Sequence, residues 1–245
     1  MTKISWAGNW LPVLHRLPGH TNGRREVALT IDDGPTDVTA HLLKTLLSVN
    51  AKATFFLNGA RLMGRSALVE RILSEGHDVY AHGVLHVRLD DGTPARLRSD
   101  LIVSEAALTS FRPTPSPYLV RLPYAAGRRK SWVHRTIRDW RHDSQIAHWS
   151  LSAEDHTIAP QCDSRAEVEQ LCAKAVAKLM AAPALDGSII LVHDVPHDVI
   201  SPYLEAATVT LFEMLVMALT GAGYAIVALR GQPSPSPLSR FLLEK

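Results

Sequence analysis

The stretch Arg25–Pro35 reads REVALTIDDGP. Apolar residues alternate with smaller ones over Val27–Ile31, which predicts a strand. The strand ends at two adjacent carboxylates, Asp32 and Asp33, followed by a Gly-Pro turn. Because neighbouring side chains at a strand end point in different directions, one carboxylate could bind a metal ion while the other faces a substrate. Two solvated acids in a turn are the alternative for this stretch taken alone.

The composition is that of an ordinary globular protein. The 245 residues are 46% hydrophobic and 20% charged, which suffices for one domain of barrel or sandwich size. A net charge of +2 is too small to indicate a nucleic-acid partner. The two cysteines, Cys162 and Cys172, show neither metal-ligand spacing nor a disulfide framework, and we expect ordinary thiols.

The amino-terminal residues lack the continuous apolar core of a signal peptide, because Asn9, Pro12, His15 and Arg16 interrupt it. The longest uncharged run, Met214–Leu229, contains two glycines and is shorter than a membrane span requires. We therefore expect a cytoplasmic protein without stable membrane insertion. A secreted protein whose leader had been removed would look the same. The sequence gives no indication of the oligomeric state.

Short apolar strands alternate with amphipathic helices along the rest of the chain. The predicted strands are Glu26–Ile31, Ala53–Asn58, Asp78–Ala81, Tyr118–Leu122, Gln145–Trp149, Ser188–Val192 and Tyr224–Leu229. The predicted helices are Asp37–Ser48, Ser66–Ser74, Pro94–Ser110, Ser131–Arg138, Arg165–Ala181 and Pro202–Leu219. Strands that alternate with long helices imply an α/β fold with a parallel sheet and helical crossovers.

Chemically reactive side chains recur where five of the predicted strands end. In parallel α/β barrels the active site is built from the carboxyl ends of several strands, so this recurrence predicts a site there. The residues concerned are Asp32 and Asp33, His82 and His86, Arg121 and Tyr124, Asp155 and His156, and His193 and Asp194.

His82 and His86 lie four residues apart, a spacing at which both imidazoles can reach one ion. A carboxylate at a neighbouring strand end would complete a zinc-type ligand set. A pair of surface histidines is the alternative for this motif alone. Gly83 stands where the metalloprotease motif H-E-x-x-H has its glutamate, so a catalytic base must come from elsewhere.

In these residues the chain resembles the polysaccharide deacetylases, the NodB-homology family of carbohydrate esterases (family 4). The resemblance covers roughly 26–230 and keeps five motifs in order. These motifs are Thr30–Pro35, His82–His86, Arg121–Tyr124, the region around Asp155, and Leu191–His193.

The resemblance implies a site residue by residue. It implies that Asp33, His82 and His86 bind one divalent metal ion, with zinc favoured and cobalt, nickel or manganese as alternatives. The implied catalytic residues are Asp32 as general base, His193 as general acid, Arg121 beside the base, Asp155 beside the acid, and Tyr124 as a backbone N–H donor to the oxyanion.

Three departures from the family pattern concern loops. Gly83 replaces a common Ser or Thr, which removes one expected hydrogen bond within its loop. Two alanines follow Tyr124 where glycine is frequent. In the fourth motif Ser150, Ser152 and His156 replace the more frequent acids and Trp, in the region that shapes the acyl pocket and sugar subsite.

Other residues that could carry chemistry are interpreted as structural. Asp90–Gly92 repeats the Asp-Asp-Gly signature, and we expect it to be a loop and helix cap. Gly127–Lys130 could bind a phosphate, but a solvated helix start is favoured. The remaining histidines without a motif are expected to be structural or on the surface; they are His41, His134, His142, His148 and His197.

Together these observations predict a distorted (β/α) barrel of seven parallel strands. We expect a lead-in segment at 1–25, a catalytic domain at 26–230 and a flexible tail at 231–245. The expected function is metal-dependent N-deacetylation of an acetylated amino sugar in a chitin- or peptidoglycan-like chain. Hydrolysis of another small amide, such as an N-formyl sugar or a cyclic ureide, is one alternative. A non-catalytic carbohydrate-binding protein is the other.

Overall fold

Strand β2, Glu26–Asp32, lies in the middle of the larger sheet. The computed structural model describes residues 10–17 and 23–232. On one side β2 pairs with β8, Ile189–His193, over its whole carboxyl-terminal half. On the other side it pairs with β3, Thr54–Leu57, near its end and with β9, Ala225–Val227, near its start. The predicted first strand is therefore the one around which the fold is assembled.

Two sheets form the barrel. The larger sheet is completed by β4 (Asp78–Ala81) beside β3 and by β7 (Leu151–Ser152) beside β8. The smaller sheet has the order β1 (Val13–Leu14), β6 (Ser144–Ala147) and β5 (Tyr118–Val120). Every pairing between these strands is parallel. Within the described residues the two sheets do not join into a closed ring, which makes this an open, distorted (β/α) barrel.

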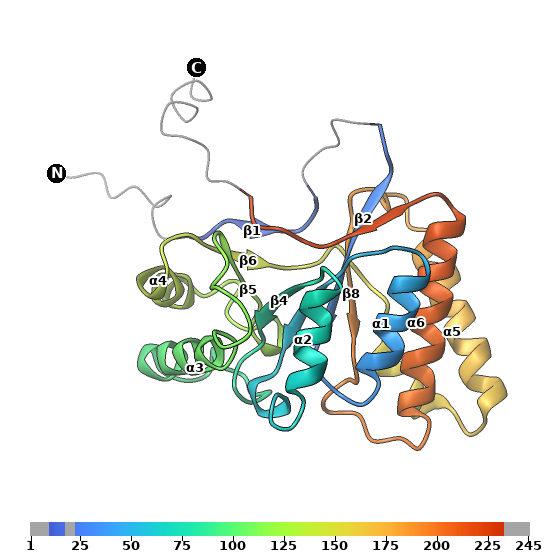
Figure 1. Cartoon of the computed structure of the whole chain (residues 1–245), viewed down its shortest axis with the longest axis horizontal. Coiled ribbons are helices and arrows are strands. Elements are labelled where there is room, and N and C mark those ends of the chain that lie inside the picture. The colour runs from blue at the N-terminus through green and yellow to red at the C-terminus, as the bar shows by residue number, and fades with distance from the viewer. Residues whose placement is uncertain (1–9, 18–22, 233–245) are drawn as a thin grey trace.

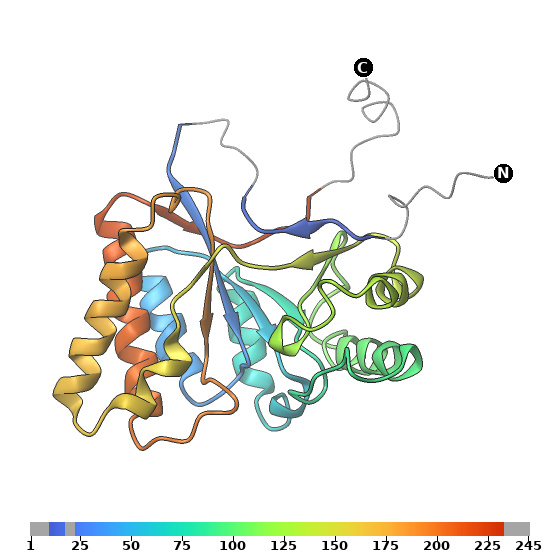
Figure 2. The same cartoon turned by 180° about the vertical axis from the view of Figure 1, so that it is seen from behind.

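The helices lie outside the strands. They are α1 (Thr39–Ser48), α2 (Ser66–Ser74), α3 (Pro94–Ala106), α4 (Ser131–Trp140), α5 (Arg165–Met180) and α6 (Leu204–Gly221). Helices α1, α6 and α5 stand together on one side of β2 and β8, and α3 and α4 lie together on the opposite side (Figure 1). The view from behind shows the same separation (Figure 2).

All seven predicted strands and all six predicted helices are present, with small shifts at their ends. The structure adds two short strands that the sequence did not predict, β1 and β7, because two-residue strands carry no periodicity. The described part of the expected lead-in packs on the domain, since β1 pairs with β6 and Leu11 is buried. The rest of that segment and the tail from 233 onward lie outside the described residues. The proposed domain boundaries stay predictions.

The two faces of β2 meet different surroundings. Val27, Leu29 and Ile31 belong to the apolar core between the sheet and the helices. Ala28 belongs instead to the core between the two sheets, as the alternation of side chains along a strand requires. By the same alternation the side chain of Asp32 faces inward, which places a carboxylate inside the barrel at its carboxyl end.

Helix α6 is long and apolar enough to cross a membrane by length and composition. It packs against α1, α5 and β9, and residues such as Leu211, Phe212 and Leu215 are buried there, as in the core helix of a globular domain. The two cysteines are buried and unpaired. Burial raises the pKa of Cys172 to about 12, which is consistent with the ordinary thiol expected from the sequence.

The turn after β2 is held by the residue that follows the neighbouring strand β8. Asp194, directly after β8, is fully buried, and its backbone N–H donates to the carbonyl of Asp32. Its carboxylate accepts the hydroxyls of Thr36 and Thr39. A Cβ atom at Gly34 would lie 2.6 Å from Oδ2 of Asp194, so only glycine fits this turn without displacement.

The first prediction concerns this turn. Gly34→Ala should lower the free energy of unfolding by about 1–3 kcal/mol, because the added methyl group overpacks against a carboxylate that two hydroxyls hold in place. Gly221→Ala is the matched control, since nothing lies within 4 Å of its added Cβ and the helix end favours alanine. Urea unfolding of both variants tests this. Equal stability of the Gly34→Ala variant and the wild type would contradict it.

Candidate active site

The predicted site residues converge at the carboxyl end of the barrel. A cavity of about 580 Å³ opens there, which is within the range of small-ligand sites. Six of the eight predicted residues line it: Asp32, Asp33, His82, His86, Tyr124 and His193. The other two, Arg121 and Asp155, are buried and contact lining residues from behind. The structure therefore brings all eight together.

A candidate metal centre lies at the end of β2. Oδ1 of Asp33 is 3.5 Å from Nε2 of His82 and 3.3 Å from Nε2 of His86. These side chains can each offer one ligand atom within 4.8 Å of the others. Oδ1 of Asp33 is buried and has no hydrogen-bond partner among the described residues. A buried carboxylate oxygen that faces two imidazoles fits a divalent cation with nitrogen and oxygen ligands, such as zinc.

Local contacts orient these ligand atoms toward one another. Nδ1 of His82 lies 2.9 Å from the carbonyl oxygen of Arg121, so this nitrogen carries the proton and Nε2 keeps its lone pair. Oδ2 of Asp33 accepts the backbone N–H of His197 at 3.0 Å, which leaves Oδ1 for the cation. Asp33 has a φ of 72°, a left-handed conformation that is uncommon for a residue with a Cβ. Such a backbone at a candidate site is consistent with a functional constraint.

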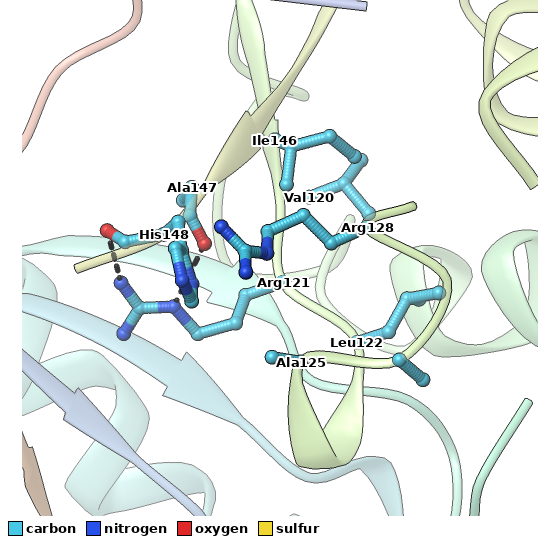
Figure 3. Close-up of a pocket in the computed structure, with 9 residues that line it drawn as sticks. Val120, Arg121, Leu122, Ala125, Arg128, Ile146, Ala147 and His148 are labelled. Atoms are coloured by element: carbon cyan, nitrogen blue, oxygen red, sulfur yellow. Dashed lines mark hydrogen bonds between the residues drawn. The ribbon is translucent and has the colours of Figure 1, made fainter. Parts of the chain in front are cut away.

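Arg121 is the central buried cation of the barrel. Its guanidinium donates at 3.1 Å to the carbonyl of Ala147, the last residue of β6, and at 3.3 Å to that of His148, which follows it (Figure 3). It also donates to the hydroxyl of Thr30 at 2.8 Å and stacks on the ring of Phe56 at 4.2 Å. The side chain therefore joins the two sheets from inside.

Asp32 is held in a different environment from its neighbour. Its Oδ1 accepts from Arg121 at 2.7 Å, and its Oδ2 lies 3.8 Å from Nε2 of His82, beside the candidate metal centre. Oδ1 of Asp32 thus accepts a hydrogen bond from Arg121, and Oδ2 faces the cavity next to the candidate metal-ligand atoms. The two adjacent aspartates consequently have different partners, as the sequence predicted.

His193 and Asp155 form a second ion pair on the cavity wall. Nδ1 of His193 lies 2.8 Å from Oδ1 of Asp155, and its backbone N–H donates to Oδ2 at 2.6 Å. Burial alone would lower the pKa of His193, but the charge and hydrogen bond of Asp155, with smaller contributions from Asp33 and Asp32, raise it to about 10. Burial would raise the pKa of Asp155, and the contacts with His193 hold it below its ordinary value instead. His193 is therefore positively charged near neutral pH.

Tyr124 lies at the cavity mouth in a strained turn. Tyr124 and Ala125 have φ values of 60° and 51°, so two consecutive residues other than glycine adopt the left-handed conformation. The sequence had singled out the alanines because glycine is frequent there. The Tyr124 ring lies 4.4 Å from that of His86, and its hydroxyl donates to Asp198. This hydrogen bond, with burial, raises the pKa of Tyr124 to about 12.

The loop that carries the two histidines contains Gly83 with a φ of 77°. A serine or threonine is disfavoured in this conformation. Asp100 on α3 stabilises the loop instead, because its carboxylate accepts the backbone N–H of Val84 at 3.2 Å. The hydrogen bond whose loss the sequence suggested is thus compensated from a neighbouring helix.

Sequence reasoning missed three residues of this region. His197 was expected to be structural or on the surface; it is exposed, and it also lines the cavity and donates its backbone N–H to Asp33. Asp198 lines the same cavity and had no assigned role. Asp194 was noted at the strand end without the turn-holding role described above. Their proximity to His193 in the sequence was the available signal, but a loop has no periodicity that reports which side chains face inward.

The second Asp-Asp-Gly sequence is outside the cluster, as expected. Asp90 accepts the backbone N–H of Gly127 at 2.9 Å and pairs with Lys130 at 3.2 Å, so it braces two loops. Thr93 then caps α3 by accepting the N–H of Arg96. The basic segment that begins at Gly127 leads directly into α4, and Lys130, at the N-cap position of that helix, pairs with Asp90 and Asp91.

Comparisons with known proteins agree with this site. The polysaccharide deacetylase family profile matches residues 19–139. A chitooligosaccharide deacetylase of Bradyrhizobium sp. is 28% identical over 177 residues, which cover 72% of this chain and 74% of that protein. The peptidoglycan-N-acetylglucosamine deacetylase PgdA of Listeria monocytogenes is 31% identical over 70% of this chain, which spans only 33% of PgdA.

The fold has counterparts among solved structures. The polysaccharide deacetylase Bc1974 from Bacillus cereus superposes with a TM-score of 0.69 at 25% identity, over 84% of this chain and 93% of that one. The fold, the order of the motifs and the sequence similarity indicate one class of protein. It is a distorted (β/α) barrel with a candidate metal centre at the carboxyl ends of its strands. The family profile, the curated relatives and the solved structures all relate this chain to the polysaccharide deacetylases.

The second prediction concerns the charge of His193. In the metal-free protein Asp155→Asn should lower the pKa of His193 far below its value of about 10, since the carboxylate is what outweighs burial. NMR titration of the His193 ring protons measures this directly. An unchanged titration would show that Asp155 is not its electrostatic partner.

The same substitution should have a pH-dependent cost in stability. A histidine with a raised pKa stabilises the folded state fully below its ordinary value of 6.5, and this contribution disappears as the pH rises to about 10. The stability difference between the wild type and Asp155→Asn should therefore shrink across that range. Urea unfolding at both ends of the range tests the sign, and a difference that grows with pH would contradict it.

Proposed function

We propose that this chain is a metal-dependent hydrolase that removes N-acetyl groups from acetylated amino sugars in an oligosaccharide or polysaccharide. One observation carries the proposal. The adjacent residues Asp32 and Asp33 lie in separate environments, one against Arg121 and the other against two imidazoles. An unpaired carboxylate oxygen for a cation and a second carboxylate beside it are the arrangement that metal-assisted amide hydrolysis requires.

The metal site of the proposal consists of Asp33, His82 and His86, with zinc as the favoured ion. Its ligand set of two imidazoles and one carboxylate also suits cobalt, nickel and manganese, and availability decides among them. A bound divalent cation supplies a Lewis acid that polarises the amide carbonyl and makes water more acidic.

The chain's own residues supply the proton transfers. Oδ2 of Asp32 accepts a proton from the attacking water, while Arg121 holds Oδ1 in place. The backbone N–H of Tyr124 donates to the developing oxyanion of the substrate. His193, which Asp155 keeps charged, donates a proton to the amine as the C–N bond breaks. An amine is a poor leaving group unless it is protonated, so this donor is essential.

The cavity supports a sugar substrate. Trp149 and Tyr124 line it and present aromatic surface to a sugar ring, while Ser152, Glu154 and His156 add polar groups on the side of the fourth motif. The relatives are named for chitooligosaccharides and peptidoglycan N-acetylglucosamine, which supports acetylated amino sugars as the substrate class.

The alternatives differ in a measurable product. Acetate release from N-acetylglucosamine oligomers that a chelator abolishes supports the proposal. Release of formate or ring-opened ureide instead would support hydrolysis of another small amide. Binding of oligomers without turnover, with metal bound, would support a carbohydrate-binding protein. The joint presence of the acid, the base and the candidate metal centre favours a catalyst.

The third prediction concerns the metal ligands. His82→Ala, purified in the folded state, should lose stoichiometric zinc, because one of the three ligands is absent. Elemental analysis after dialysis measures the bound metal, and circular dichroism verifies the fold. Stoichiometric metal in the folded variant would show that His82 is not a ligand.

The fourth prediction separates the base and the acid from the ligands. Asp32→Asn and His193→Ala should each lower turnover about 10²–10⁴-fold, as loss of general acid–base catalysis does, while zinc stays bound. Acetate release and metal content are measured on the same preparation. Full activity in Asp32→Asn would refute the assigned base, and loss of the metal in it would indicate that Asp32 is a ligand.

A further inference from the structure

The loop between β8 and α6, residues 194–203, lies against the candidate metal centre. It places two consecutive residues, His197 and Asp198, in the wall of the cavity. Neither residue has a role in the function proposed above. Their contacts with the ligands Asp33 and His86 show what they contribute.

His197 contacts two ligands at once. Its backbone N–H donates to Oδ2 of Asp33 at 3.0 Å. Its ring stacks on that of His86, with centroids 4.7 Å apart and planes 18° from parallel. The loop is therefore held against both ligands, which fixes where the next residue lies.

Asp198 faces the outer nitrogen of His86. Its Oδ2 lies 3.6 Å from Nδ1 of His86, which is buried and has no hydrogen-bond partner among the described residues. Oδ2 also accepts the hydroxyl of Tyr124, and Oδ1 lies 3.4 Å from Nδ1 of His197. The carboxylate is thus fixed by two neighbours in an orientation that presents an oxygen to His86.

Each of the two proposed histidine ligands has an acceptor near its Nδ1 atom, but the acceptor differs between them. A histidine that binds a cation through Nε2 carries its proton on Nδ1, and a partner for that proton sets the ring orientation. For His82 the partner is the carbonyl of Arg121. For His86 a carboxylate oxygen of Asp198 lies 3.6 Å from Nδ1.

We propose that Asp198 is a positioning residue for the metal ligand His86, and that it couples the ligand to the Tyr124 turn. The inference rests on the proposed metal site. It adds an acceptor that fixes the His86 tautomer and makes the imidazole a better ligand. The hydroxyl of Tyr124 donates to the same carboxylate oxygen. The Asp198 carboxylate therefore contacts both the metal ligand His86 and the turn that is proposed to carry the oxyanion donor.

The experiment compares two substitutions that each remove one negative charge from the cavity. Asp198→Asn removes the carboxylate that faces His86. Glu154→Gln removes a carboxylate of similar exposure, 55% against 59%, that lines the same cavity and approaches His156. Zinc affinity is measured by competition with a chromogenic chelator, and this readout does not require catalysis.

Asp198→Asn should weaken zinc binding about 10–100-fold, as substitutions of such orienting partners do, and Glu154→Gln should change it little. Tyr124→Phe keeps the ring against His86 and removes only the hydroxyl on Asp198, so it should weaken zinc binding by a smaller factor. This variant also provides the test if Asp198→Asn does not fold.

Several results would overturn the inference. Equal losses in Asp198→Asn and Glu154→Gln would assign the effect to cavity charge alone. Unchanged affinity in Asp198→Asn, with zinc bound to the wild type, would refute the inference and leave the metal site standing. A wild type that binds no zinc would refute both. Two ions in the wild type and one in Asp198→Asn would make Asp198 a ligand of a second ion, since His86, His197 and Asp198 also lie within 4.8 Å of one another.

Discussion

The buried ion pair between Arg121 and Asp32 is the interaction on which the rest of the site depends. The two side chains are 1% and 4% exposed, and their atoms are 2.7 Å apart. A buried charge is tolerated only when its polar atoms are satisfied, and loss of one partner typically costs about 3–5 kcal/mol. Arg121 meets this condition because it donates to Thr30 and Asp32 in one sheet and to backbone carbonyls at the end of β6 in the other. The pair therefore holds an open barrel together where it carries the site.

The same arginine separates the roles of two adjacent carboxylates. Its guanidinium donates a hydrogen bond to the carboxylate of Asp32. Its backbone carbonyl accepts a hydrogen bond from Nδ1 of His82, and Nε2 of that ring consequently faces Asp33. The left-handed backbone of Asp33 directs its carboxylate to the histidines, and the buried Asp194 holds the turn that permits this. On the opposite wall Asp155 keeps His193 charged. The proposed base, the candidate metal site and the proposed acid thus face one cavity, each fixed by a different partner.

The sequence predicted the parts of this structure that carry a period or a motif. Apolar alternation such as that of Val27–Ile31 predicted the main strands, helical periodicity predicted the helices, and the strand ends supplied the eight candidate site residues. It could not place β1 and β7, because two residues show no alternation. It gave His197 and Asp198 no role at the cavity, because both lie in a loop whose path is set by stacking on His86 and a hydrogen bond to Asp33. Such tertiary contacts leave no trace in local sequence.

The central claim is that Asp33, and not Asp32, binds the metal together with the two histidines. Anomalous diffraction at the zinc edge, on crystals of the zinc-loaded protein, tests it most directly. The account predicts one ion at about 2.0–2.2 Å from Asp33, His82 and His86, with Asp32 still paired to Arg121. An ion coordinated by Asp32, or one bound only between His197 and Asp198, would contradict it.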